Sequence, residues 1–393
     1  MEQELNRNQH FDEVPTNEIL LRRTGLLADG SWNMLNYIAI TLLFTGVLHY
    51  FAKIVFQMEF LDLLGLMKTI HLTLIYFFVA ASSYSVLKGS QVFLEMHTMI
   101  KNGFKFYKTP YSEEQIRIKR ETNKRIVRNT KIFIFIFVSA LFSTILKEEL
   151  PVDFEEWNRN YSGWFPIKIN SWPRYIGTQV YHAIIATALD ACSCTFFTIF
   201  VTFADHICAE IKILIIAVTD MFDPKKNPHS KKNGVDRKEQ IISCIKHHIE
   251  ILRCIDKLQQ YYKGVLIYTL TGASVVLCTM AYMLTDPNTT LSSVIAFLTL
   301  GISEVSVSMF YCINGQKITD LMDKLRFTIY SNSFWYSQKL EIRFYILMML
   351  TRTKRSVTLT AGGLTSCNLD GYKDIVQGTW AYFNMLRAFR GKE

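Results

Sequence analysis

Proline and glycine are scarce in this sequence of 393 residues, which contains eight prolines and 18 glycines, while half of the residues are hydrophobic. This composition excludes collagen-like and disordered chains. Nucleophile motifs, glycine-rich phosphate loops and metal-binding patterns are also missing, so we expect no enzyme, no cofactor and no metal. The first 33 residues are polar and lack an apolar core followed by a small-residue cleavage site, so we expect no cleavable signal peptide.

The eight cysteines show no pattern typical of a metal site. Two of them lie inside an apolar stretch as Cys192-Ser-Cys194, and no second pair stands at zinc spacing. We therefore interpret the cysteines as small buried side chains.

Long apolar stretches are what the sequence has in abundance. A helix needs ~20 apolar residues to cross a hydrocarbon core of ~30 Å. Six stretches qualify: Met34–Phe56, Leu66–Leu87, Thr130–Leu146, Tyr181–Ala204, Gly264–Leu284 and Leu291–Asn314. A seventh candidate, Tyr372–Phe389, begins with polar residues but becomes apolar and aromatic. The predicted fold is an all-α membrane protein with seven transmembrane helices.

The connections between these stretches alternate in charge. Gly89–Arg128, Asp205–Tyr262 and Gly315–Ser356 are rich in Lys and Arg, whereas Gln57–Gly65 and Thr285–Thr290 have none. Because basic loops stay in the cytoplasm, this pattern places the N-terminus in the cytoplasm and the C-terminus outside. The two Asn-x-Ser/Thr sequences, at Asn160 and Asn288, fall in connections predicted to lie outside, where glycosylation occurs.

Several connections have sequence patterns that predict their structure. Apolar residues recur every three to four positions from Ile241 to Ile255, and Gln115–Thr130 is similar, so both predict amphipathic helices that continue into the next span. Ile318–Leu350 predicts further cytoplasmic helix, with a polar break near Asn332. The outer connection Glu148–Val180 contains three tryptophans and three prolines. It is either a lid over the helix ends or an interfacial aromatic belt.

The outer halves of the spans combine apolar walls with a few hydroxyl groups, which suits a small hydrophobic ligand. The candidate ligand-binding residues are Tyr76, Phe142, Tyr181, Ile185 and Met280. Ordinary helix packing is the alternative for each of them. Acidic residues within the spans, Glu304 and Asp190, predict either a functional site or a hydrogen bond between helices.

The last third of the chain carries motifs of a known family. The run Phe310-Tyr311-Cys312-Ile313-Asn314-Gly315-Gln316-Lys317-Ile318-Thr319 resembles the end of the sixth span in insect odorant receptors. Tyr330-Ser331-Asn332-Ser333-Phe334-Trp335-Tyr336 resembles the family's Tyr-x-x-x-Trp-Tyr stretch with one additional residue. Leu359-Thr360-Ala361-Gly362 and Ala381-Tyr382-Phe383-Asn384-Met385-Leu386-Arg387 follow in family order.

This resemblance implies a subunit of a heterotetrameric, ligand-gated cation channel that is assembled with the odorant co-receptor and opened by a small volatile ligand. By position, the family's hydrophobic gate falls on Met385, Ala388 and Phe389. Asp205–Tyr262 is too short to hold the insertion found in the co-receptor, so the chain resembles a ligand-tuning subunit. The implied location is the plasma membrane of olfactory dendrites.

The resulting division of the chain has five parts. They are a cytoplasmic N-terminus (1–33), a six-helix region with the ligand pocket (34–314), cytoplasmic anchor helices (315–371), a last pore helix (372–389) and an outer tail (390–393).

Three alternatives remain. A gustatory receptor shares the fold, but its closing Thr-Tyr…Gln-Phe pattern is absent. A G-protein-coupled receptor requires an outside N-terminus, and neither Asp-Arg-Tyr nor Asn-Pro-x-x-Tyr occurs. A transporter would usually show repeats or paired broken helices, which the sequence lacks.

Overall fold

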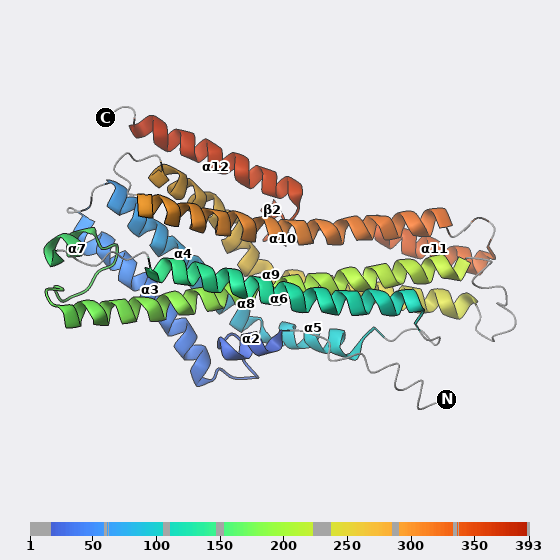
Figure 1. The fold of residues 1–393 in the computed structure, drawn as a ribbon. Helices are drawn as coiled ribbons and strands as arrows, with labels where there is room; N and C mark the ends of the chain where they lie inside the picture. The colour runs from blue at the N-terminus through green and yellow to red at the C-terminus, as the bar shows by residue number, and fades with distance from the viewer. Residues whose placement is uncertain are drawn as a thin grey trace.

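The computed structural model is an elongated helical bundle (Figure 1). It describes residues 17–58, 61, 63–104, 111–146, 153–222, 237–284, 291–332, 336 and 338–390. The helices are α2 (Glu18–Arg23), α3 (Met34–Gln57), α4 (Leu63–Lys88), α5 (Ser90–Asn102), α6 (Glu113–Leu146), α7 (Phe154–Asn160), α8 (Trp172–Phe222), α9 (Arg237–Leu284), α10 (Leu291–Asn332), α11 (Leu340–Thr353) and α12 (Leu369–Arg390). Each predicted span lies within one helix, which confirms the all-α prediction.

Four helices are long and apolar enough to cross a membrane by length and composition alone, among the residues that the structure describes. They are α3, α4, α8 and α9. The apolar part of α6 is short, and α12 begins with charged residues, so these two helices depend on their neighbours for a place in the bilayer.

Three helices are far longer than a membrane is thick. α8 has 51 residues, α9 has 48 and α10 has 42. At 1.5 Å per residue, each exceeds 60 Å, against about 30 Å for the hydrocarbon core. The spans therefore continue as helices below the membrane, as the amphipathic patterns predict. Figure 1 shows α7 at one end of the bundle and α11 at the other, which are its outer and cytoplasmic ends.

α8 is the central helix of the bundle. It packs against α3, α6, α9 and α10. Phe200, Phe203, Ile207, Ile211 and Leu214 of α8 are at most 1% exposed. Outside the bilayer, a helix with apolar residues on every side is stable only when other helices surround it, so the sequence of α8 dictates its central place.

A buried ionic cluster joins three helices in the cytoplasmic half. The Glu210 carboxylate of α8 lies 3.3 Å from Lys119 Nζ of α6 and 3.1 Å from His247 Nε2 of α9. Burial raises the pKa of Glu210, but the His247 hydrogen bond and the Lys119 charge outweigh it, so the net pKa lies below its usual value. Glu210 is therefore ionised at neutral pH.

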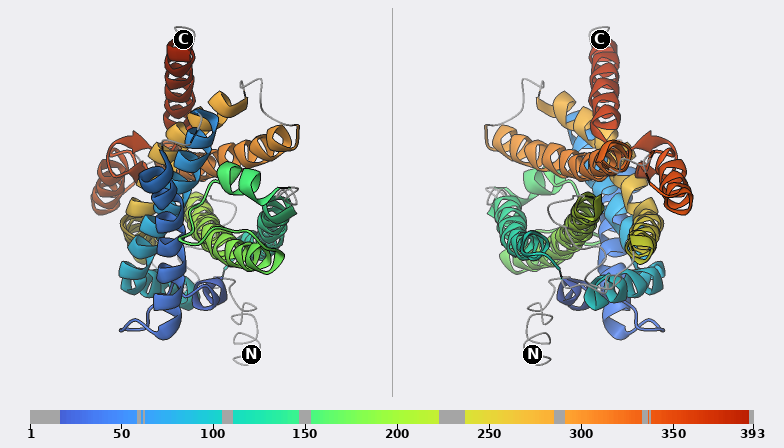
Figure 2. Two further views of the ribbon diagram at one scale, coloured as in Figure 1. Left: turned by 90° about the vertical axis from the view of Figure 1, so that its left-hand side faces the viewer. Right: turned by 90° about the vertical axis from the view of Figure 1, so that its right-hand side faces the viewer.

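A short β-hairpin leads into the last helix. β1 (Thr360–Ala361) pairs antiparallel with β2 (Thr365–Ser366), and the turn uses Gly362 and Gly363 at positive φ. Gln259 of α9 bonds both the amide and the carbonyl of Thr360, at 2.6 and 2.7 Å. The hairpin thus attaches the start of α12 to α9, and Figure 2 shows α12 at the edge of the bundle.

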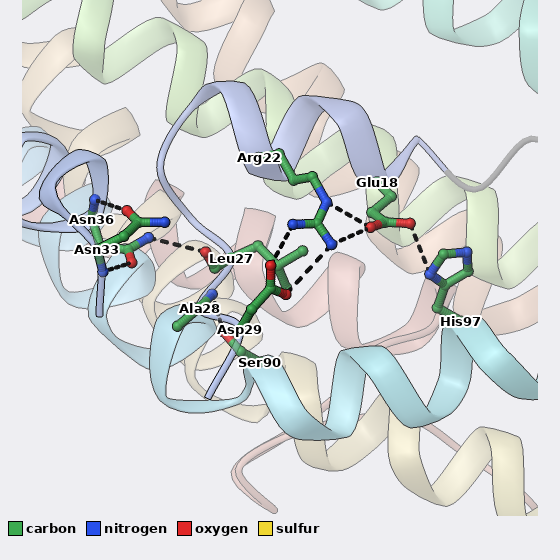
Figure 3. Close-up of polar contacts among 9 residues, drawn as sticks. All are labelled: Glu18, Arg22, Leu27, Ala28, Asp29, Asn33, Asn36, Ser90 and His97. Carbon is green, nitrogen blue, oxygen red and sulfur yellow. Dashed lines mark hydrogen bonds and ion pairs between the residues drawn. The ribbon is translucent and has the colours of Figure 1, made fainter. Parts of the chain in front are cut away.

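The segment before the first span is docked by polar contacts (Figure 3). Arg22 of α2 pairs with Glu18 at 2.7 Å and with Asp29 at 2.5 Å, and Glu18 also contacts His97 of α5 at 3.0 Å. Asn33 and Asn36 form a capping box at the start of α3. These contacts fix the entry of the chain into the membrane.

Replacing Glu210 with Ala should lower the thermal unfolding midpoint of the purified protein in detergent at neutral pH. The change leaves the partly buried Lys119 without its carboxylate, at a cost on the order of 3 kcal/mol. The depressed pKa means that the carboxylate stabilises the fold near neutrality and loses this effect only as the pH falls through that pKa. The matched control is Glu121→Ala, in an exposed pair with Arg117, which should change little. Equal midpoints for the two variants would contradict the stabilising role.

Candidate functional site

A group of tyrosines lies between α3, α4 and α8 in the outer half of the bundle. Tyr50, Tyr76 and Ile185 are buried, and the partly buried Tyr181 packs against them. We call these four residues the tyrosine cluster. The rings of Tyr50 and Tyr76 have centroids 5.3 Å apart. The cluster unites residues from three helices, and three of its four members are candidates named from the sequence.

Glycine makes this close packing possible. A Cβ atom at Gly46 of α3 would lie 2.4 Å from the Tyr76 ring, closer than any real contact. The helix surface is therefore hollowed at Gly46 to receive the ring of α4. The position of Tyr76 depends on a residue that has no side chain.

Hydrogen bonds orient two of the hydroxyl groups. Tyr50 Oη lies 2.6 Å from His182 Nε2, and Tyr181 Oη donates to the Thr45 carbonyl at 3.4 Å. The site therefore combines aromatic and aliphatic walls with hydroxyl groups held in place. Such a lining suits an apolar molecule with at most one or two polar atoms.

The outer connection folds over this cluster. Tyr161 Oη lies 3.0 Å from His49 Nε2, and the Trp164 amide donates to the His49 carbonyl at 3.1 Å. Phe165 packs against both the His49 and the Tyr181 ring, with centroids 4.7 and 5.7 Å away, and these two rings are 5.3 Å from each other. A Cβ at Gly163 would lie 1.9 Å from His49, so this loop presses directly on α3. Of the two interpretations of Glu148–Val180, the packing of its described part is that of a lid.

The lid is itself a folded unit. The side-chain Nδ2 of Asn158 donates to the Phe154 and Ile169 carbonyls, both at 2.6 Å. Lys53 of α3 is buried below it and donates to the Asn158 carbonyl at 3.2 Å. Trp157 stacks on Tyr161 at 4.6 Å. In an interfacial aromatic belt these side chains would face the lipid headgroups, whereas here they form hydrogen bonds and ring contacts with one another.

The other two ligand candidates lie apart from the tyrosine cluster. Met280 of α9 is buried with Val276 against partly buried residues of α4. Next to it, His71 Nδ1 lies 2.9 Å from Thr279 Oγ1. Phe142 of α6 is 64% exposed. The structure thus brings Tyr76, Tyr181 and Ile185 together, whereas Met280 lies in a separate buried contact between α9 and α4 and Phe142 lies on the exposed side of α6.

Several members of the site were not identified from the sequence. Gly46, His49, Tyr50 and Lys53 are all buried on α3. Their spacing of three, four and seven residues marks one helix face, and this regularity in an apolar span is the signal that could have found them.

The last helix presents a mixed surface. Ile375 and Phe383 are buried, while Trp380, Tyr382 and Met385 are at least half exposed. α12 packs on α9 and α10 and leaves its other side open. Ala388 and Phe389 belong to α12, but their side chains lie outside the described part of the chain. The same holds for the side chain of Asn160, and Asn288 lies wholly outside it.

The chain is similar to known receptors. The family model described as 7tm Odorant receptor matches residues 62–380. Odorant receptor 85f of Drosophila melanogaster is 24% identical over 159 residues, which is 40% of each chain. Odorant receptor 13a of the same organism is 19% identical over 230 residues, 56% of this chain and 54% of that one. The chain thus matches about half the length of these relatives.

A solved structure has the same fold. The insect olfactory receptor OR5 from Machilis hrabei in complex with eugenol aligns with a TM-score of 0.77 at 16% identity, covering 94% of this chain and 96% of that one. At such low identity the likeness concerns the fold alone. Because the family model covers most of the sequence, this multi-pass membrane chain belongs to the 7tm odorant receptor family.

Proposed function

We propose that this chain is the ligand-tuning subunit of a heteromeric, non-selective cation channel that opens when a small volatile organic molecule binds. The observation that carries the proposal is the tyrosine cluster, a largely apolar site with oriented hydroxyl groups in the outer half of the membrane region, covered by a folded lid. The similar receptor from Machilis hrabei was solved with eugenol, a small aromatic molecule, which supports the same class of ligand here.

In this proposal the ligand contacts Tyr76, Tyr181 and Ile185 first. Met280 of α9 and Phe142 of α6 lie apart from this cluster in the same half of the bundle. Burial of a small apolar molecule against these side chains stabilises the complex by removing apolar area from water, and a tyrosine hydroxyl fixes its orientation.

The pore is assigned to α12. Its exposed residues include Trp380, Tyr382 and Met385, which are at least half exposed in the single chain and would face the same helix of other subunits. Rings of apolar side chains close a pore by excluding water. By resemblance, Met385, Ala388 and Phe389 form that gate.

Assembly with other subunits has support at the cytoplasmic end. Phe344, Leu347 and Met348 of α11 are 44% or more exposed. Together with Arg352 and Arg355 they form an open patch on the surface of α11 and the residues that follow it. An exposed apolar patch in the cytoplasm marks a protein interface. We assign it to the contact with the odorant co-receptor in the heterotetramer.

Ligand binding is coupled to the pore through packed helices. α4, which carries Tyr76, packs on α9, and α9 packs on α12. A ligand shifts this arrangement toward the open channel only if it binds the open form more tightly than the closed form. A shift of α4 on α9 is therefore the step that moves the last helix.

The cellular setting follows from the same proposal. The channel acts in the plasma membrane of olfactory sensory dendrites, with the lid facing outward. Asn160 and Asn288 are then the candidate glycosylation sites on the outer face.

Co-expression with an odorant co-receptor tests the function. Cells with both chains should give cation currents when a panel of volatile molecules is applied, and cells with the co-receptor alone should not give them for the same molecules. The measurement is whole-cell recording with surface labelling of this chain. Silence across a diverse panel, with the chain present at the surface, would count against the proposal.

Replacing Ile185 with Ala should weaken the response to an active ligand. The loss of one methylene and two methyl groups raises the half-maximal concentration about tenfold or more. Dose–response curves of the evoked current measure the shift. Ile176→Ala is the matched control, because Ile176 lies on the same helix and is 57% exposed. Equal curves for the two variants would remove Ile185 from the site.

Replacing Met385 with Ala should increase the current without ligand. A smaller side chain widens the apolar constriction and makes its dewetting less favourable. Thr379→Ser is the control within α12, because it keeps the hydroxyl that donates to the Ile375 carbonyl at 2.9 Å. Unchanged basal current in Met385→Ala channels, at equal surface expression, would exclude Met385 from the gate.

A further inference from the structure

A second cavity lies between α3 and α8. Its volume is ≈ 540 Å³. Leu35, Ile38 and Leu42 form one wall, and the small residues Ala183 and Ala188 leave space on the other. Ile38 is 44% and the neighbouring Ile184 is 49% exposed, so the cavity opens toward the surroundings of the bundle. In a membrane-spanning region those surroundings are lipid.

The position and length of the cavity match one leaflet. α3 enters the membrane from the cytoplasm at Met34, so the wall from Leu35 to Leu42 lies in the cytoplasmic half. α8 runs in the opposite direction, so its lining starts at Val180, beside Tyr181 of the tyrosine cluster, and ends at Cys192 on the cytoplasmic side. Twelve helical steps rise by about 18 Å, close to the ~15 Å of half a hydrocarbon core. The groove therefore has the length of an acyl chain in the cytoplasmic leaflet.

The cytoplasmic end of the cavity is basic. Arg23, Thr24 and Gly25 line it there. The neighbouring Arg22 already pairs with Glu18 and Asp29. Arg23 is exposed, and no described Asp or Glu carboxylate forms an ion pair with it. Both guanidinium groups are charged, but only Arg22 has described carboxylate partners, so Arg23 is the one open to an outside anion.

The backbone around Arg23 is held in place. Gly25 has a φ of +70°, and a Cβ there would lie 2.5 Å from the Leu35 carbonyl oxygen, so the chain lies directly against α3. The side-chain Nδ2 of Asn36 donates to the Gly25 and Leu27 carbonyls at 2.7 and 3.1 Å. The Ala28 amide donates to Ser90 Oγ at 3.1 Å. Figure 3 shows the contacts of Leu27 and Ala28 beside the paired Arg22.

We propose that this groove binds an anionic phospholipid of the cytoplasmic leaflet, with one acyl chain between α3 and α8 and the headgroup phosphate paired with Arg23. A guanidinium group recognises phosphate oxygens through two parallel hydrogen bonds. The cytoplasmic leaflet supplies anionic lipid. The bound lipid connects α2, α3 and α8 at the point where the chain enters the membrane.

A volatile ligand is the other molecule that would fit an apolar groove. It would not use a guanidinium group at the membrane surface, and it would not fill a groove with the length of a leaflet. The tyrosine cluster, in contrast, is short and covered. The charge and the length together favour the lipid.

Photolabelling tests the proposal without any need for an odorant response. The full chain, in nanodiscs of neutral phosphatidylcholine, receives a trace of phosphatidylserine or phosphatidylcholine with the same diazirine-bearing acyl chain. Labelled peptides are mapped by mass spectrometry. We expect phosphatidylserine to label residues of α3 and α8 in the groove about fivefold more than phosphatidylcholine.

Three variants sharpen the test. Arg23→Gln should abolish the preference for phosphatidylserine, and Ala188→Phe should reduce groove labelling by both lipids. Lys131→Gln removes an exposed basic residue at the cytoplasmic end of another span and should leave the preference intact. Thermal unfolding in phosphatidylcholine nanodiscs verifies that each variant is folded.

Two results would overturn the proposal. Equal groove labelling by the two lipids in the wild-type chain would identify ordinary annular lipid. Loss of the label on addition of a volatile ligand, with no dependence on Arg23, would identify the groove as a ligand site.

Discussion

The continuity of the long helices from the membrane into the cytoplasm is the constraint on which the rest of the structure depends. Inside lipid every backbone amide and carbonyl must be satisfied within the protein, and an unbroken helix does this without help. α8, α9 and α10 continue as unbroken helices beyond the bilayer, where they pack on one another. The ionic cluster around Glu210 and the core around Phe203 are consequences, because both need helices that do not change direction at the membrane surface.

This framework separates two environments for polar groups. Below the membrane, charges meet as pairs, such as Glu210 with Lys119. Around the tyrosine cluster, the polar side-chain contacts are formed by hydroxyl and imidazole groups, such as Tyr50 with His182, and a lid closes over them. A site for a neutral, apolar ligand is compatible with the second environment and not with the first. The helix that lines the proposed pore stands at the edge of the bundle and is tied to it by the hairpin at Thr360.

The sequence predicts those parts of the fold that have a period or a charge bias. The seven spans, the cytoplasmic extensions and the orientation follow from apolar length, helical spacing and the Lys and Arg distribution. The site is predicted less well. Tyr76, Tyr181 and Ile185 converge, but Tyr50 joins them only because Gly46 lets two helices approach, a tertiary effect that spacing alone does not reveal. The hairpin and the packing of the lid depend on contacts between distant segments, Gln259 with Thr360 and His49 with Tyr161, and have no local pattern.

The central claim is that ligand binding and ion conduction belong to one assembly of such chains. Reconstitution of the purified complex with an odorant co-receptor into a planar lipid bilayer, without G protein or nucleotide, measures this most directly. The account predicts stepwise cation currents when a ligand that is active in cells is added. Electrically silent bilayers that contain the inserted complex, together with cellular responses that require GTP, would contradict it.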